Sequence, residues 1–284
     1  MNSFEHQHEA MATTFVIHVA GHPAEYARQA AAAAFRELDR LEGELSVFVE
    51  SSDIARANRL AGDESITIGD DAWQCLLLAA GVAQATDRAF DPAYATERAA
   101  GTPAGAPPFT LDPATHTLTS HVARLHLDLG AIGKGYALDR LGELLGEWNV
   151  TRACLHSGGS TVLALAPPED RSGWPVNLDA GGSRPTLRLA HAALSGSGLT
   201  VQGTHLVDPR TGGPAARSTR TWALAPSAAL SDALSTAFFV WSDDAIAAFC
   251  AAHPEVGAAL LTPDGRLVAH AALQELLRAA DPAS

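Results

Sequence analysis

The sequence has few cysteines, and none of them lie close together. Cys75, Cys154 and Cys250 are the only three, and no CxxC pair occurs. Nothing therefore suggests a zinc knuckle, an iron–sulfur site or a disulfide framework, and an odd number of thiols is typical of a reducing compartment. The GxSxG and HExxH patterns of serine hydrolases and zinc peptidases are also absent.

Basic residues are scarce as well. The chain has 19 Lys and Arg against 32 Asp and Glu, a formal net charge of −13, which argues against nucleic acid or an anionic membrane surface as the main partner. No apolar run is long enough to cross a bilayer. The polar residues 1–11 lack the basic and apolar regions of a signal peptide. We therefore expect a cytoplasmic protein with no membrane insertion.

Apolar residues are plentiful, at 47% of the chain against 18% charged residues, so the chain is expected to fold. We predict one domain over residues 1–284, with residues 1–10 disordered. Apolar spacing predicts helices over residues 24–45, 70–86, 136–145, 230–241 and 272–280. Alternation predicts strands over residues 13–19, 124–129, 153–156, 161–166, 187–189, 222–225, 258–261 and 267–270. Because the two kinds of element do not alternate regularly, we predict an α+β fold with mixed or mainly antiparallel sheets and flanking helices.

A glycine-rich segment over residues 127–136 lies where a predicted strand passes into a predicted helix. Glycines there let the backbone approach a ligand, and the free N–H groups of the helix N-terminus suit phosphate. Lys134 adds a positive charge in the first turn. The spacing matches neither GxxxxGK[ST] nor GxGxxG, so a tight turn with a solvated lysine fits the pattern equally well.

Asp232 and Thr236 are four residues apart on a predicted apolar helix, so they share one face. A carboxylate and a hydroxyl are hard oxygen ligands, suited to Mg²⁺ or Ca²⁺. If Asp232 is buried there, it needs a counter-charge. The alternative is a first-turn aspartate whose side chain lies in solvent.

Three shorter motifs also leave two interpretations open. His205 stands before an Asp-Pro turn and could act as a general base, or it could belong to a surface hairpin. The segments Ser157-Gly158-Gly159 and Ser195-Gly196 could cradle a ligand or form simple turns.

Taken in order, these motifs resemble those of the ApbE family of FAD:protein FMN transferases. The similar segments are residues 11–15, 45–48, 52–54 with 58, 90–92, 128–136, 157–159, 195–196, 205–212 and 232–236. They run from about residue 11 to about residue 270, although Ala12 stands where the family has glycine. The resemblance implies an ApbE-like (T-fold-like) architecture.

The resemblance also implies an activity. Such enzymes bind FAD and Mg²⁺, join FMN through its phosphate to a Ser or Thr of a target flavoprotein, and release AMP. By this likeness the Ala131 carbonyl, Asp232 and Thr236 hold the metal, and His205 is the general base. The residues expected to contact FAD are Met11, Phe48, Asp128, Lys134, Ser157, Gly158, Gly159, Ser195 and Leu206.

The sequence is also compatible with two alternatives to protein flavinylation. In the first, water takes the place of the acceptor hydroxyl, and the protein is a Mg²⁺-dependent FAD pyrophosphatase that yields FMN and AMP. In the second, the protein binds flavin without catalysing a reaction. The formation of AMP, with and without a target protein, distinguishes the three.

Overall fold

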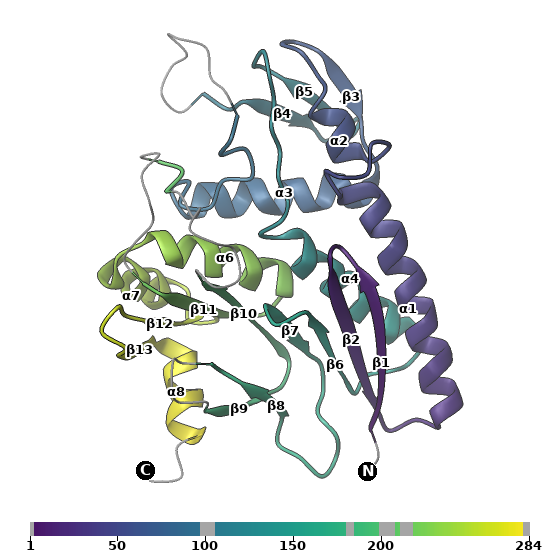
Figure 1. The fold of residues 1–284 in the computed structure, drawn as a ribbon, viewed down its shortest axis with the longest axis vertical. Helices are drawn as coiled ribbons and strands as arrows, with labels where there is room; N and C mark the ends of the chain where they lie inside the picture. Colours follow the sequence, from purple (N-terminus) through teal and green to yellow (C-terminus); the bar gives the residue numbers. More distant parts are fainter. Residues whose placement is uncertain (1–2, 97–105, 180–184, 199–207, 211–217, 281–284) are drawn as a thin grey trace.

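The computed structural model describes residues 3–96, 106–179, 185–198, 208–210 and 218–280. Figure 1 shows a large sheet with most of the helices packed along one side. The helices are α1 (Ala24–Leu45), α2 (Asp53–Ala57), α3 (Asp70–Ala85), α4 (Gly133–Glu147), α6 (Ala228–Val240), α7 (Asp243–Ala252) and α8 (Ala271–Ala280).

The large sheet has eight strands in the order β1-β2-β6-β7-β10-β11-β12-β13. These strands are β1 (Ser3–Ala10), β2 (Thr13–Ala20), β6 (Ala153–Ser157), β7 (Thr161–Ala164), β10 (Ala192–Gly198), β11 (Arg220–Ala225), β12 (Gly257–Leu261) and β13 (Leu267–His270). Two small sheets comprise β3 (Ser65–Thr67), β5 (Thr117–Ser120) and β4 (Phe109–Asp112), and β8 (Trp174–Asn177) with β9 (Thr186–Leu189). All strand pairs in the described residues are antiparallel, which confirms the predicted fold class.

The large sheet separates two apolar cores. On one face it packs against α4 and α6, and Phe15, Leu155 and Phe238 are fully buried in that core. On the other face it packs against α8 and the β8–β9 pair, around residues such as Leu187 and Leu273. Alternate residues of each strand therefore face different layers, as the two-residue repeat of a strand requires.

The prediction that residues 1–10 are disordered is wrong for residues 3–10. These residues form β1, which pairs with β2 along its whole length, from Ser3 opposite Ala20 to Ala10 opposite Thr13. Its polar composition hid the strand, because β1 is an edge strand and alternate side chains point to solvent. The ring of His8 stacks on Phe35 of α1, with ring centroids 5.1 Å apart.

The predicted strand over residues 124–129 is also absent from the described sheets. Its three leucines are buried as the alternation indicated, with Leu127 at 0% exposure. The backbone of Leu127, however, bonds to a side chain and not to a neighbouring strand. Asn58 Nδ2 donates to the Leu127 carbonyl at 2.9 Å, and the Leu127 N–H donates to Asn58 Oδ1 at 2.6 Å. The alternation of apolar and polar residues over 124–129 therefore reflects burial and not strand pairing.

All three cysteine thiols are buried in the folded chain. Burial raises the pKa of each of them, since a thiolate is poorly solvated in an apolar core. Every helix within the described ranges is too short or too polar to cross a membrane.

Helices α4 and α6 cross with their backbones in close contact. A Cβ atom built on Gly135 of α4 would lie 2.2 Å from the carbonyl oxygen of Ala228, at the start of α6. No side chain fits in that gap, so only glycine permits this crossing.

We expect Gly135→Ala to lower the free energy of unfolding by about 2 kcal/mol or more, because one backbone must move away from the other. Gly146→Ala is the matched control on the same helix, since nothing lies within 4 Å of a Cβ at Gly146. There alanine should be neutral or stabilise the helix by up to about 1 kcal/mol. Urea unfolding of both variants measures the difference, and equal effects would contradict the close contact.

Candidate functional site

A cavity of about 370 Å³ opens between the β1–β2 turn, the end of α1 and the start of α4. Four of the residues predicted to contact FAD line it: Met11, Phe48, Asp128 and Lys134. They come from three segments that are far apart in sequence. The structure therefore gathers these predicted residues around one space.

The β1–β2 turn forms one wall of this cavity. Met11 and Ala12 both have positive φ angles, 49° and 58°, as a two-residue turn between antiparallel strands requires. Because its φ is positive, Ala12 adopts a conformation that glycine adopts with less strain. The Met11 N–H donates to Glu42 Oε1 of α1 at 2.8 Å, which ties the turn to that helix.

Polar groups form the opposite wall. Asp128 Oδ1 accepts the Gly130 N–H at 2.8 Å, and Lys134 Nζ donates to the Gly130 carbonyl at 2.5 Å. Phe48, across the cavity, is 91% exposed. The cavity thus combines an ammonium group at a helix N-terminus with an accessible aromatic ring, a combination suited to an anionic ligand that carries a flat apolar group.

Asp232 contacts the first turn of α4. It is buried in α6, with 5% exposure. The Gly135 N–H donates to its Oδ2 at 3.3 Å, and Thr161 Oγ1 donates to its Oδ1 at 3.3 Å. Burial raises the pKa of Asp232, while the positive charge of Lys134 acts in the opposite direction. The alternative in which the Asp232 side chain lies in solvent is therefore wrong.

Three hydroxyl side chains form a row across the sheet under Asp232. Ser157 lies opposite Thr161, and Thr161 lies opposite Ser195, on β6, β7 and β10. Directly opposite residues point to the same face, so the Ser157 and Ser195 hydroxyls share the face on which Thr161 reaches Asp232. All three side chains are fully buried, and the Ser157 and Ser195 hydroxyls have no hydrogen-bond partner in the described part of the chain.

Thr236 and Ala131 complete the predicted metal ligands. Thr236 Oγ1 lies 3.4 Å from Ser197 Oγ, which is 2.8 Å from Ser235 Oγ. Ala131 precedes α4, one turn before Gly135. The predicted ligands thus come from the two helical segments that meet at the α4–α6 crossing.

These groups fit a hard divalent cation. The donors are a carboxylate and hydroxyls, and such oxygen ligands suit Mg²⁺. In the described residues no group of three or more His, Cys, Asp and Glu is placed to hold a metal, so a site rich in imidazole or thiolate is not available there. A cation would give buried Asp232 a counter-charge in direct contact, in addition to the more distant charge of Lys134. Ligands bound beside it would pair with the hydroxyls of Ser157 and Ser195.

The glycine turn between β6 and β7 adjoins the β1–β2 turn. Gly158 has a φ of 54°, and a Cβ there would lie 2.3 Å from Thr13 Oγ1. The Gly158-Gly159 segment therefore forms a turn, whereas Ser195-Gly196 lies inside strand β10. His205 and Leu206 lie outside the described residues.

Two other sequence motifs meet at a smaller cavity of about 300 Å³, which Asp91 and Arg210 help to line. Arg210 makes a two-pronged ion pair with Asp208, with Nε and Nη2 donating at 3.0 and 2.9 Å. Asp91 lies 3.5 Å from Arg88. The Phe-Asp-Pro and Asp-Pro-Arg segments are therefore neighbours in space. In the sequence, Asp91 and Asp208 are 117 positions apart (208 − 91).

No local sequence pattern marks Thr161 as a partner of Asp232 or Glu42 as a partner of Met11. Thr161 contacts Asp232 only because β6, β7 and β10 pair in one particular register, which no local pattern reveals. The bond of Glu42 to Met11 joins residues that are 31 positions apart, so no local pattern reveals it.

We expect Asp232→Asn to raise the melting temperature in metal-free buffer at pH 7, because the amide removes the cost of burying a charge. The folded-state pKa of Asp232 is raised. Its stabilising contribution is therefore present below the unfolded-state pKa and is lost as the pH rises through the folded-state pKa. Accordingly, the melting temperatures of the parent and the Asp232→Asn protein should converge as the pH falls.

Thermal unfolding over a pH series tests this expectation. Asp244→Asn, at an exposed aspartate of α7, is the control and should show no comparable trend. An Asp232→Asn protein that is less stable than the parent at every pH would contradict the account of this buried charge.

Comparison with known sequences supports one family. The model of the ApbE family matches residues 11–261. The FAD:protein FMN transferase of Treponema pallidum is 31% identical over 189 residues, which cover 59% of this chain and 52% of that protein. One from Klebsiella pneumoniae is 24% identical over 212 residues, which cover 63% of this chain and 65% of that protein. The matched region is thus less than two thirds of the length of either relative.

Solved structures show the same fold. A variant of the flavin transferase ApbE from Vibrio cholerae superposes with a TM-score of 0.85 at 19% identity, covering 98% of this chain and 100% of that one. The ApbE protein of Thermotoga maritima gives a TM-score of 0.83 at 22% identity with the same coverage. Since the family model spans most of the sequence, this chain belongs to the ApbE family.

Proposed function

We propose that this protein is a Mg²⁺-dependent FAD:protein FMN transferase that attaches FMN to a Ser or Thr of a target flavoprotein and releases AMP. The observation that carries the proposal is the meeting of a cavity and a buried carboxylate at the first turn of α4. Lys134 lines the cavity of Met11 and Phe48, and the N–H of the next residue, Gly135, donates to buried Asp232. An anionic flavin dinucleotide in the cavity would therefore lie beside a carboxylate that can hold a cation.

The residues have distinct parts in this proposal. Phe48 and Met11 contact the flavin, while Lys134 and the N–H groups at the start of α4 attract its phosphates. Asp232 and Thr236, with the Ala131 carbonyl, hold Mg²⁺. The bound ion would neutralise charge that develops on the phosphate oxygens and align the leaving AMP.

The bond changes are those of a phosphoryl transfer. The acceptor hydroxyl oxygen forms a bond to the FMN phosphorus, and the bond from that phosphorus to the bridging oxygen breaks. The bridging oxygen leaves with AMP, and His205 takes the hydroxyl proton as general base. Because the chain has a net charge of −13, binding of a dianion needs local positive charge, which Lys134, the N-terminus of α4 and a bound cation would supply beside Glu42 and Asp128.

The direct test is incubation of the protein with FAD and MgCl₂, with and without a target flavoprotein, followed by chromatography for AMP and mass spectrometry of the target. AMP that forms only with the target, together with an FMN adduct on Ser or Thr, is the expected result. AMP without the target would instead identify a pyrophosphatase. Tight flavin binding with no AMP would identify a non-catalytic binder. The predicted cytoplasmic location is tested by cell fractionation.

We expect Asp232→Ala to lower the rate of Mg²⁺-dependent AMP formation by at least about a hundredfold, because the cation loses its only carboxylate in the proposed site. Asp244→Ala, at an exposed α7 position, should keep the parent rate. Circular dichroism of both variants checks that the fold is retained. Full activity of Asp232→Ala would defeat the metal assignment.

A further inference from the structure

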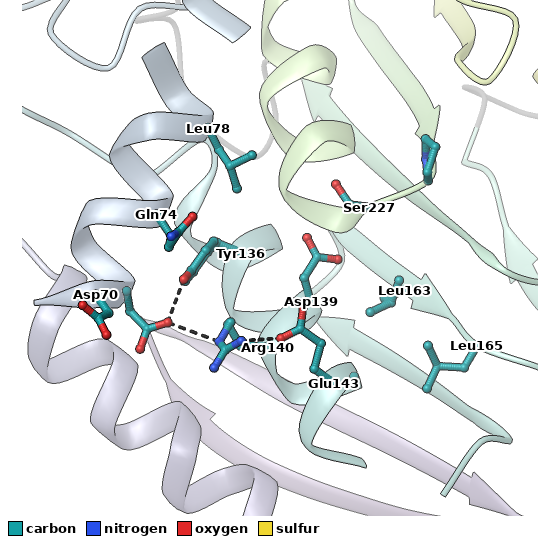
Figure 2. A pocket seen from close by; sticks show the side chains of 13 residues that line it. Asp70, Gln74, Leu78, Tyr136, Asp139, Arg140, Glu143, Leu163, Leu165 and Ser227 are labelled. Carbon is teal, nitrogen blue, oxygen red and sulfur yellow. Dashed lines mark hydrogen bonds and ion pairs between the residues drawn. The ribbon is translucent and has the colours of Figure 1, made fainter. Parts of the chain in front are cut away.

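A second, larger cavity of about 820 Å³ lies between α3, α4, β7 and the start of α6 (Figure 2). Its acidic side chains are not equivalent. Asp71 and Glu143 both form ion pairs with Arg140, the former at 3.2 Å. In Figure 2, Asp139 instead points toward the N-terminus of α6, near Ser227. No Lys, Arg or His of the described residues lies within ion-pair distance of Asp139.

The partners of Asp139 are backbone groups of α6. Its Oδ1 accepts the Ala228 N–H at 2.7 Å, and its Oδ2 accepts the Ala229 N–H at 2.8 Å. The next N–H, that of Leu230, is capped by the Ser227 hydroxyl at 3.2 Å. A carboxylate of α4 therefore satisfies the first two free donors of α6 and adds a negative charge at the positive end of that helix.

Asp139 and Gly135 are four residues apart on α4, so they contact α6 from the same face. Gly135 touches the Ala228 carbonyl and donates to Asp232, one turn further along α6. Asp139 fixes the start of that same turn. The two contacts together hold α6 against both rotation about its axis and sliding along α4.

We propose that Asp139 is a positioning residue, which holds Asp232 and Thr236 of α6 in register with Ala131 and Lys134 at the start of α4. This inference rests on the proposed function, since it concerns the same metal and phosphate site. It adds a residue that touches neither flavin nor metal but sets the distance between the two segments that do.

The cost of burying Asp139 supports a specific role. Burial raises its pKa to about 6, although the two backbone N–H groups lower it, and the neighbouring charges of Glu143 and Asp232 raise it further. A charged group in this place is thus opposed by its surroundings, and among the described residues only the helix N-terminus favours it. A neutral residue would avoid that cost but would release the start of α6.

The test measures cation binding directly in the full-length protein, with Mn²⁺ as a paramagnetic probe for Mg²⁺ and electron paramagnetic resonance as the readout. Asp139→Ala removes both acceptors, whereas Asp139→Asn retains one and nearly the same shape. Glu143→Gln, one turn along the same helix and exposed to solvent, is the matched control. Urea unfolding at the same pH shows how much of each variant is folded.

For the folded fraction of Asp139→Ala we expect the Mn²⁺ dissociation constant to rise about tenfold or more, with a smaller rise for Asp139→Asn. The kcat for AMP formation should fall while the KM for FAD changes by less than about twofold, because the flavin cavity does not contain Asp139. Glu143→Gln should have the same Mn²⁺ dissociation constant, kcat and KM as the parent. If Asp139→Ala does not fold, the same three quantities measured on Asp139→Asn test the positioning role.

Two failures are distinguishable. If the parent binds Mn²⁺ and the folded Asp139 variants bind it equally well, with loss of stability only, the positioning role is wrong and the proposed function stands. If the parent itself binds no Mn²⁺ and forms no AMP, the proposed function is wrong, and the role of Asp139 within it is overturned as well.

Discussion

The contact between Gly135 and the Ala228 carbonyl sets the geometry on which the candidate site depends. Because Gly135 has no side chain, the start of α4 lies directly against the start of α6. The Gly135 N–H has no partner within its own helix and can therefore reach Asp232. Lys134, the preceding residue, points toward the cavity lined by Met11 and Phe48. One tight helix crossing thus brings a cationic group, a buried carboxylate and an open cavity together.

Charges of both signs meet at the candidate site. In a chain with a net charge of −13, Lys134 and the N-terminus of α4 bring positive charge to a cavity that Glu42 and Asp128 also line. The chain also buries Asp232 without an arginine or lysine in direct contact among the described residues. Such a carboxylate is costly in the free protein and becomes favourable when a cation binds. In the proposed function, bound Mg²⁺ would offset that cost.

Apolar residues at helical spacing predicted α1, α3, α4, α6 and α8, whereas α2 and α7 were not predicted. The predicted strand over residues 124–129 was wrong, because the alternation there reflected burial while Asn58 supplied the backbone partners. Family resemblance pointed to Met11, Phe48, Asp128 and Lys134, which the structure places around one cavity. The apolar helix around Asp232 left its burial open, and the structure shows it buried. The contacts of Thr161 and Asp139 were not predicted, since both depend on strand register and helix packing between distant segments. Long-range geometry of this kind leaves no local pattern.

The burial of the three cysteines bears on the environments that this fold tolerates. Thiol chemistry with oxidants or alkylating reagents proceeds through the thiolate, and here burial both hides the sulfur atoms and raises their pKa. Cys75, the most deeply buried, lies at 0% exposure. In a folded molecule, reaction of these sulfhydryl groups with an oxidant would therefore have to wait until the core opens locally. The packing of the core thus slows oxidation by itself, whatever the redox state of the surroundings.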